Sequence, residues 1–183
     1  MNDLQYNIVK AMGYHLMSQS SRLAFIQSRV SAESFVRDEC SLAASIFLAD
    51  LGFNVHMEKK AQNKKVDIII VPTIDKIEDW DDRYLFELKM AWPGSLGECS
   101  KKIRSDFRAL VGKSNAWVIV LYFAFTDCPQ WMPYGKRKHG FEDGLINLIT
   151  RIDHGDPDCY GPKFQMSYEN VKGKAQLLGW RVD

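Results

Sequence analysis

Apolar residues recur every three to four positions at the start of the chain. This spacing predicts a helix over residues 3–28, because such positions share one face of a helix. We expect this N-terminal helical extension, residues 1–30, to pack on the core or on a second subunit. Its apolar stripe consists of Leu4, Ile8, Met12 and Leu16.

A second helical pattern runs from about residue 32 to about residue 51. Ser31 is the candidate N-cap, and Gly52 is the candidate C-terminal stop. Glu39 falls near the middle of the apolar face, whereas Arg37 falls on the opposite side. The predicted apolar face consists of Phe35, Val36, Leu42, Ala43, Ile46 and Phe47.

Strand patterns follow at residues 53–57, 66–71 and 84–91. Short connections join these segments, so we expect three antiparallel neighbours. A continuous apolar run at residues 116–125 predicts a fully buried central strand. A helical crossover precedes this run, which predicts that it lies parallel to the third strand.

The crossover helix should begin near Ser95, which forms a capping box with Glu98. A further helix is predicted over residues 141–152, and weaker strand signals cover residues 164–168 and 175–182. The order of elements predicts the α/β class, as a three-layer α/β/α sandwich with a mixed central sheet. The apolar stripe of the crossover helix consists of Leu96, Cys99, Ile103, Phe107 and Leu110.

Three charged residues interrupt the apolar strands: Asp67 in KVDIIIV, and Glu87 and Lys89 in YLFELKMAW. Desolvating an unpaired charge is costly, so these residues need partners. Side chains alternate across a strand, which puts Glu87 and Lys89 on one face. If the two strands pair, Asp67 and Glu87 converge, and a cation between them would relieve their repulsion. Their oxygen ligands suit Mg²⁺ or Mn²⁺, which can activate a water molecule.

This pattern resembles the PD-(D/E)xK nuclease superfamily, which includes restriction endonucleases. The resemblance covers roughly residues 33–125 and implies a restriction-endonuclease-like fold. It implies that Asp67, Glu87 and the carbonyl of Leu88 bind the metal and that Lys89 assists the attacking water. It also implies that Glu39 completes the site. Val66 precedes Asp67 where the family often has proline.

Other assignments of these charges stay open. Glu33 lies at the edge of the same helix face and replaces Glu39 if the helix register differs. Glu87 and Lys89 could instead form an ion pair on an edge strand. A second ExK sequence begins at Glu58, but no apolar strand bearing an aspartate precedes it. We therefore assign the site to the later motif.

The remaining polar residues give weaker signals. The acidic loop at residues 73–83 lacks the spacing of a calcium-binding loop. Four potential zinc ligands match no common zinc-finger spacing, and the cysteines are expected to be reduced thiols. These ligands are Cys128, His139, His154 and Cys159. The candidate nucleic-acid contacts are Lys101, Lys102, Lys136, Arg137 and Lys138.

Lys and Arg together number 24 against 23 for Asp and Glu, so any attraction to nucleic acid must come from local basic clusters. Neither a signal peptide nor a membrane span is expected, and we predict a cytoplasmic location. We expect one nuclease-like domain over residues 1–183, with a catalytic core at 31–125 that residues 126–183 complete.

The predicted activity is metal-dependent endonucleolytic hydrolysis of DNA. We expect a homodimer, because cutting both strands of a duplex requires two active sites. One alternative is a nuclease-like module without catalytic activity that serves nucleic-acid binding or assembly, and another is a nuclease that acts on RNA.

Overall fold

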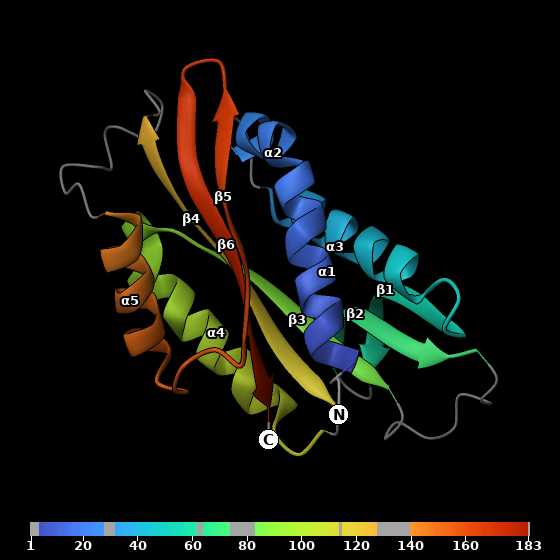
Figure 1. Ribbon diagram of the computed structural model, residues 1–183. Helices are drawn as coiled ribbons and strands as arrows, with labels where there is room; N and C mark the ends of the chain where they lie inside the picture. The colour runs from blue at the N-terminus through green and yellow to red at the C-terminus, as the bar shows by residue number, and fades with distance from the viewer. Residues whose placement is uncertain are drawn as a thin grey trace.

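Figure 1 shows a mixed sheet with helices packed on both of its faces. This computed structural model describes residues 4–27, 32–61, 64–73, 83–113, 115–127 and 140–182. The helices are α1 (Leu4–Ser18), α2 (Ser20–Gln27), α3 (Glu33–Leu48), α4 (Leu96–Leu110) and α5 (Phe141–Ile152), with a 3₁₀ turn, η2 (Pro93–Ser95), before α4. The strands are β1 (Phe53–Ala61), β2 (Lys64–Pro72), β3 (Tyr84–Ala91), β4 (Ala116–Asp127), β5 (Cys159–Tyr168) and β6 (Val171–Val182).

The six strands form one sheet in the order β1-β2-β3-β4-β6-β5. β1, β2 and β3 are antiparallel neighbours, and β4 lies parallel to β3 after the α4 crossover. β6 and β5 extend the sheet with antiparallel pairing. These arrangements confirm the α/β class, the mixed sheet and the central place of the apolar run that forms β4.

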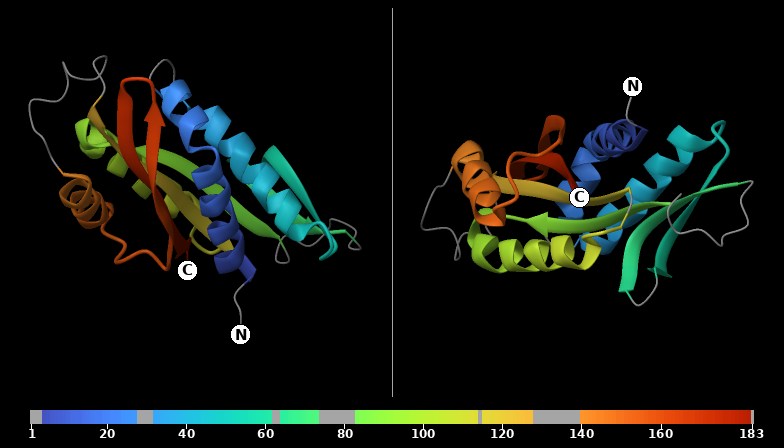
Figure 2. Two further views of the ribbon diagram at one scale, coloured as in Figure 1. Left: turned by 45° about the horizontal axis from the view of Figure 1, so that its top comes forward. Right: turned by 90° about the horizontal axis from the view of Figure 1, so that it is seen from below.

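Alternation of side chains divides the core into two layers. On one face, Ile68, Phe86 and Ile119 pack with apolar residues of α1, α2 and α3. On the other face, Val118 and Val120 pack with α4 and α5. The right-hand view of Figure 2 shows α1 and α3 on one side of the sheet and α4 on the other.

The N-terminal segment forms two helices rather than the single helix predicted, with a break at Gln19. The apolar stripe of α1 is buried against this chain's own core. At Gly13 the helix approaches β5 so closely that an added Cβ would lie 2.9 Å from Pro162 Cδ. α1 therefore packs on the core, and its stripe is not available to a second subunit.

The buried face of α3 differs from the predicted one. Small side chains at Cys40, Ala43 and Ala44 face inward and let the helix lie close to the sheet. Leu42 and Ile46, predicted to be buried, are 49% and 63% exposed. The helical pattern was correct, but the two surfaces that α3 contacts, α1 and the sheet, select a different face. Ser31, the candidate N-cap, lies outside the described residues.

α4 begins where the sequence predicts, but without the capping box. The Ser95 hydroxyl donates to the Trp92 carbonyl, and no side-chain cap hydrogen bond forms. The Glu98 carboxylate instead lies 2.8 Å from Lys102 Nζ, one turn further along the helix. The 3₁₀ turn η2 leads directly into α4. No helix in the described part of the chain has the length and apolar character needed to cross a bilayer.

Candidate metal centre

The candidate site forms where β2 and β3 separate. Their ladder consists of three residue pairs and ends at Ile68 and Phe86. Asp67 directly precedes Ile68 in β2 and so lies just outside this ladder. Its Oδ2 accepts a hydrogen bond of 2.9 Å from the Leu88 N–H, a group that a longer ladder would have paired. The carboxylate thus links the two strands across the opening between them.

Lys89 lies at the centre of the charged side chains. Its ammonium donates to Glu87 Oε1 at 3.1 Å and to the Leu88 carbonyl at 3.0 Å. Three more carboxylates lie within 4 Å of Nζ: Asp106 Oδ2 at 3.4 Å, Asp67 Oδ2 at 3.9 Å and Glu33 Oε1 at 3.9 Å. The four carboxylates come from α3, β2, β3 and α4, so the lysine joins both helical layers to the sheet.

Burial strengthens these interactions, because charges interact more strongly where water is excluded. The Glu87 side chain is 7% exposed, and that of Lys89 is 19% exposed. Burial alone lowers the pKa of Lys89, but the surrounding carboxylates, with Glu87 foremost, outweigh it and raise the pKa above the ordinary value of 10.5. Lys89 therefore carries a positive charge at neutral pH.

Arg37 supplies a second positive charge. Its Nη1 lies 3.4 Å from Asp67 Oδ1, and the side chain is 19% exposed. The sequence placed Arg37 on the side of the helix opposite the core. The structure turns it toward Asp67 of β2, and because Arg37 lies one helical turn after Glu33, these two residues of α3 face the strand charges together.

Glu39 has a different environment from the one predicted. Its Oε2 lies 2.6 Å from His15 Nε2, and its Oε1 lies 3.3 Å from Arg22 Nη1. These partners belong to α1 and α2, whereas Glu33 approaches Lys89. The register of α3 separates the two glutamates onto different sides of the helix. Glu33 is therefore the glutamate of α3 that the structure places beside the strand charges.

Two neighbours of the strand charges, Asp106 and Arg37, were missed in the sequence. A signal for Asp106 was present, because it interrupts the apolar stripe of α4 three residues after Ile103 and four before Leu110. An acidic residue in such a stripe needs a buried partner, as Asp67 does in its strand. The signal for Arg37 was only its spacing of four residues from Glu33.

The site has the donors for a divalent cation. Carboxylate and carbonyl oxygens are the ligands that Mg²⁺ and Mn²⁺ prefer. In the part of the chain that the structure describes, the four carboxylates around Lys89 outnumber the two positive charges of Lys89 and Arg37 by two (four minus two). Among the described residues, no three Asp, Glu, His or Cys side chains are already arranged to hold a metal. The carboxylates face the ammonium, which is the cation they share in this structure.

The other predicted residues lie elsewhere. Lys101 and Lys102 are exposed on α4, and Lys102 pairs with Glu98. The basic cluster at 136–138 lies outside the described residues, as does most of the acidic loop at 73–83 and the side chain of Glu58.

The candidate zinc ligands do not share one site among the described residues. His154 stacks on Phe107, whereas Cys159 lies in the core layer that contains α1. Burial raises the pKa of the Cys159 thiol to about 11, which disfavours the thiolate that zinc requires. Cys128 and His139 lie outside the described residues. Cys40, Cys99 and Cys159 are free thiols.

Comparison with known proteins gives no relative: no protein-family model, no curated protein and no solved structure matches the chain.

Proposed function

We propose that this chain is a Mg²⁺- or Mn²⁺-dependent endonuclease that hydrolyses phosphodiester bonds in DNA. The observation that carries the proposal is the gathering of Asp67, Glu87 and Lys89 where β2 and β3 separate. The order α3-β1-β2-β3-α4-β4, with β4 parallel to β3, also suits the restriction-endonuclease-like fold that the PD-(D/E)xK resemblance implies.

Each residue of the site has a role in this proposal. Asp67, Glu87 and the Leu88 carbonyl hold the metal, and Glu33 is the helix glutamate best placed to complete the site. When bound, the metal supplies Lewis-acid activation of the phosphodiester and of a water molecule. Lys89 orients the attacking water or stabilises charge that develops on the phosphate.

DNA binding is part of the proposal. Lys101 and Lys102 present positive charge on the exposed side of α4, and residues 136–138 add three basic side chains in sequence. Such residues would contact phosphates without reading bases. We propose a two-fold dimer for cutting both strands of a duplex. Sedimentation at high concentration that finds only monomers would contradict the dimer alone.

The test is cleavage of plasmid DNA, single-stranded DNA and RNA, each with Mg²⁺, Mn²⁺ or a chelator. We expect DNA to be cut only with a divalent cation. Asp67→Ala and Lys89→Ala should each abolish cutting. A matched control is Lys163→Ala, which removes an exposed lysine of β5 that pairs with Glu142 and lies outside the proposed site. Cleavage that survives both site substitutions would refute the assignment.

The outcomes also separate the alternatives. Cutting of RNA alone would move the activity to another substrate class while keeping the site. Binding of DNA without cleavage of any substrate would favour a nuclease-like binding module. In that module the ion pairs around Lys89 would serve only to join the sheet to its helices.

A further inference from the structure

Asp106 is the member of the charged group that comes from α4. Its side chain is 11% exposed, and it lies in the same helical stripe as Ile103 and Leu110, which are fully buried. Removing a carboxylate from water is costly unless a cation accompanies it. The ion pair of 3.4 Å with Lys89 Nζ supplies such a cation to Asp106, and Lys89 in turn is held from the α4 side of the sheet.

The other contacts of Lys89 are different in kind. Under the proposed function, Glu87, the Leu88 carbonyl, Asp67 and Glu33 all serve the metal. Their oxygens also face the ammonium, at 3.0 to 3.9 Å. The lysine and a divalent cation thus compete for the same oxygens. Asp106 is the contact of Lys89 that has no assigned role in holding the metal.

We propose that Asp106 is a positioning residue, which holds Lys89 beside the reacting groups while Glu87 and Asp67 serve the metal. Without Asp106, the ammonium would either stay on the metal-binding oxygens or turn toward solvent. In both cases Lys89 would be misplaced for the attacking water. This inference rests on the proposed function, but its central contact can be tested without DNA.

The first test measures the lysine itself. The ¹⁵N–H signal of an ammonium is observed when ion pairs hold the group and slow its exchange with water, and Lys89→Met identifies the signal of Lys89 by its loss. We expect Asp106→Asn to broaden or abolish this signal. The matched control is Glu98→Gln, which removes one exposed acid from the same helix and should leave the signal unchanged.

The second test is a double-mutant cycle on the unfolding equilibrium in the absence of metal. Residues in direct contact couple, so the effect of Asp106→Asn should differ about fivefold or more between the wild-type and Lys89→Met backgrounds. If Asp106→Asn does not fold, Asp106→Glu, which displaces the carboxylate by one methylene, allows a cycle with a smaller expected coupling. An unchanged lysine signal together with additive effects would overturn the proposal, whether or not the protein cuts DNA.

The third test uses cleavage kinetics and Mn²⁺ binding. Asp106→Asn should lower kcat about tenfold with little change in KM, and should change kcat less than about twofold when Lys89 is already Met. Asp106→Glu should restore part of kcat. Mn²⁺ affinity, followed by electron paramagnetic resonance, should fall less than about threefold, since a lost ligand typically costs more. If Asp106→Asn instead lowered Mn²⁺ affinity tenfold, also in the Lys89→Met background, Asp106 would be a metal ligand. That result would overturn its positioning role.

Discussion

Two ionic clusters lie along α3, and they differ in their balance of charge. Around Lys89, four carboxylates face that lysine, and Arg37 adds one further positive charge beside Asp67. Around Glu39, a single carboxylate faces two basic side chains, His15 and Arg22. Within the residues that the structure describes, carboxylates outnumber basic side chains in the first cluster but not in the second.

This difference separates the proposed binding site from a structural contact. Glu39 has its partners within the fold and ties α3 to α1 and α2, so it has little need of a further cation. The Lys89 cluster gathers like charges at 3 to 4 Å from one ammonium, which is unfavourable unless another cation also serves them. The proposed site is thus distinguished by buried charge of one predominant sign, and not by buried charge alone.

The largest expected effect is that of Lys89→Met. Cleavage should fall at least about a hundredfold, because a group that stabilises charge in the transition state is lost. The free energy of unfolding without metal should fall by about 3 kcal/mol, because the carboxylates lose the cation they share. Denaturant unfolding and plasmid cleavage measure both effects. A variant as stable as the parent would mean that the carboxylates do not depend on Lys89.

The comparison of the two clusters predicts a difference between the two glutamates of α3. Glu33→Gln should weaken Mn²⁺ binding about tenfold, since it removes a charge beside the proposed ligands. Glu39→Gln should change Mn²⁺ affinity by less than about twofold, because its partners are His15 and Arg22. Titration calorimetry of both variants checks the order. The reverse order would restore Glu39 as the residue that completes the site.

Alkaline pH should act on the Lys89 cluster. The pKa of Lys89 is raised in the fold, so its stabilising contribution is fully present below the unfolded value of 10.5 and is lost as pH rises through the higher folded value. The difference in unfolding free energy between the parent and Lys89→Met should therefore shrink above about pH 10.5. Denaturant unfolding from pH 8 upward measures it. A difference that stays constant would show that packing, not charge, makes the contribution.

The smallest effect is expected for Arg22→Ala. The Arg22 side chain is 62% exposed, so its ion pair with Glu39 is worth less than about 1 kcal/mol. Its guanidinium also lies 4.8 Å from the centre of the Phe35 ring, a contact of similarly small size. The unfolding free energy should fall slightly, with no change in Mn²⁺ affinity. A strong effect of Arg22→Ala on Mn²⁺ affinity would mean that the two clusters act as one site.

Much of the fold could be predicted because its patterns are strong and local. β3 at 84–91 and α5 at 141–152 have the predicted bounds, since β3 is an apolar run interrupted only by Glu87 and Lys89, and helical spacing is regular throughout α5. The parallel pairing of β3 with β4 followed from the crossover helix. The proximity of Asp67, Glu87 and Lys89 followed from strand alternation and the order of the strands.

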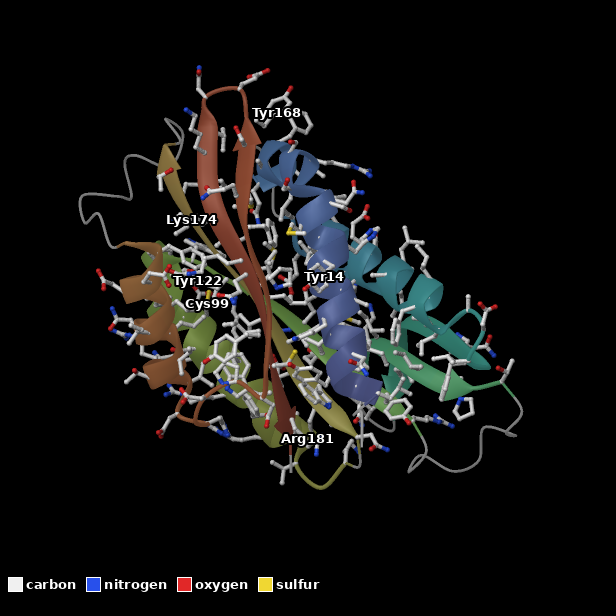
Figure 3. The ribbon with its side chains drawn as sticks, in the orientation of Figure 1. Tyr14, Cys99, Tyr122, Tyr168, Lys174 and Arg181 are labelled. Atoms are coloured by element: carbon white, nitrogen blue, oxygen red, sulfur yellow. The ribbon has the colours of Figure 1, made fainter. Side chains whose placement is uncertain are left out.

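What could not be predicted depends on packing between elements. Helical spacing shows which residues share a face, but it does not show which neighbour covers that face. α1 covers the side of α3 that contains Glu39, and the sheet lies against its small residues. For this reason Leu42 and Ile46 are exposed, and Glu33 rather than Glu39 reaches Lys89. On α1, by contrast, Tyr14 (labelled in Figure 3) is 56% exposed, which agrees with its place outside the predicted apolar stripe.

The short ladder between β2 and β3 affects which part of the protein unfolds locally. Three residue pairs join the β1–β2 hairpin to the rest of the sheet, whereas β4 and β6 pair along most of their length. Such a hairpin is the kind of unit that unfolds locally, at a free energy below that of the whole domain. Asp67 belongs to the hairpin, whereas Glu87 and Lys89 belong to the rest of the sheet. Amide hydrogen exchange at Leu88, whose N–H is bonded to the Asp67 carboxylate, would then report how often the two halves of the site separate.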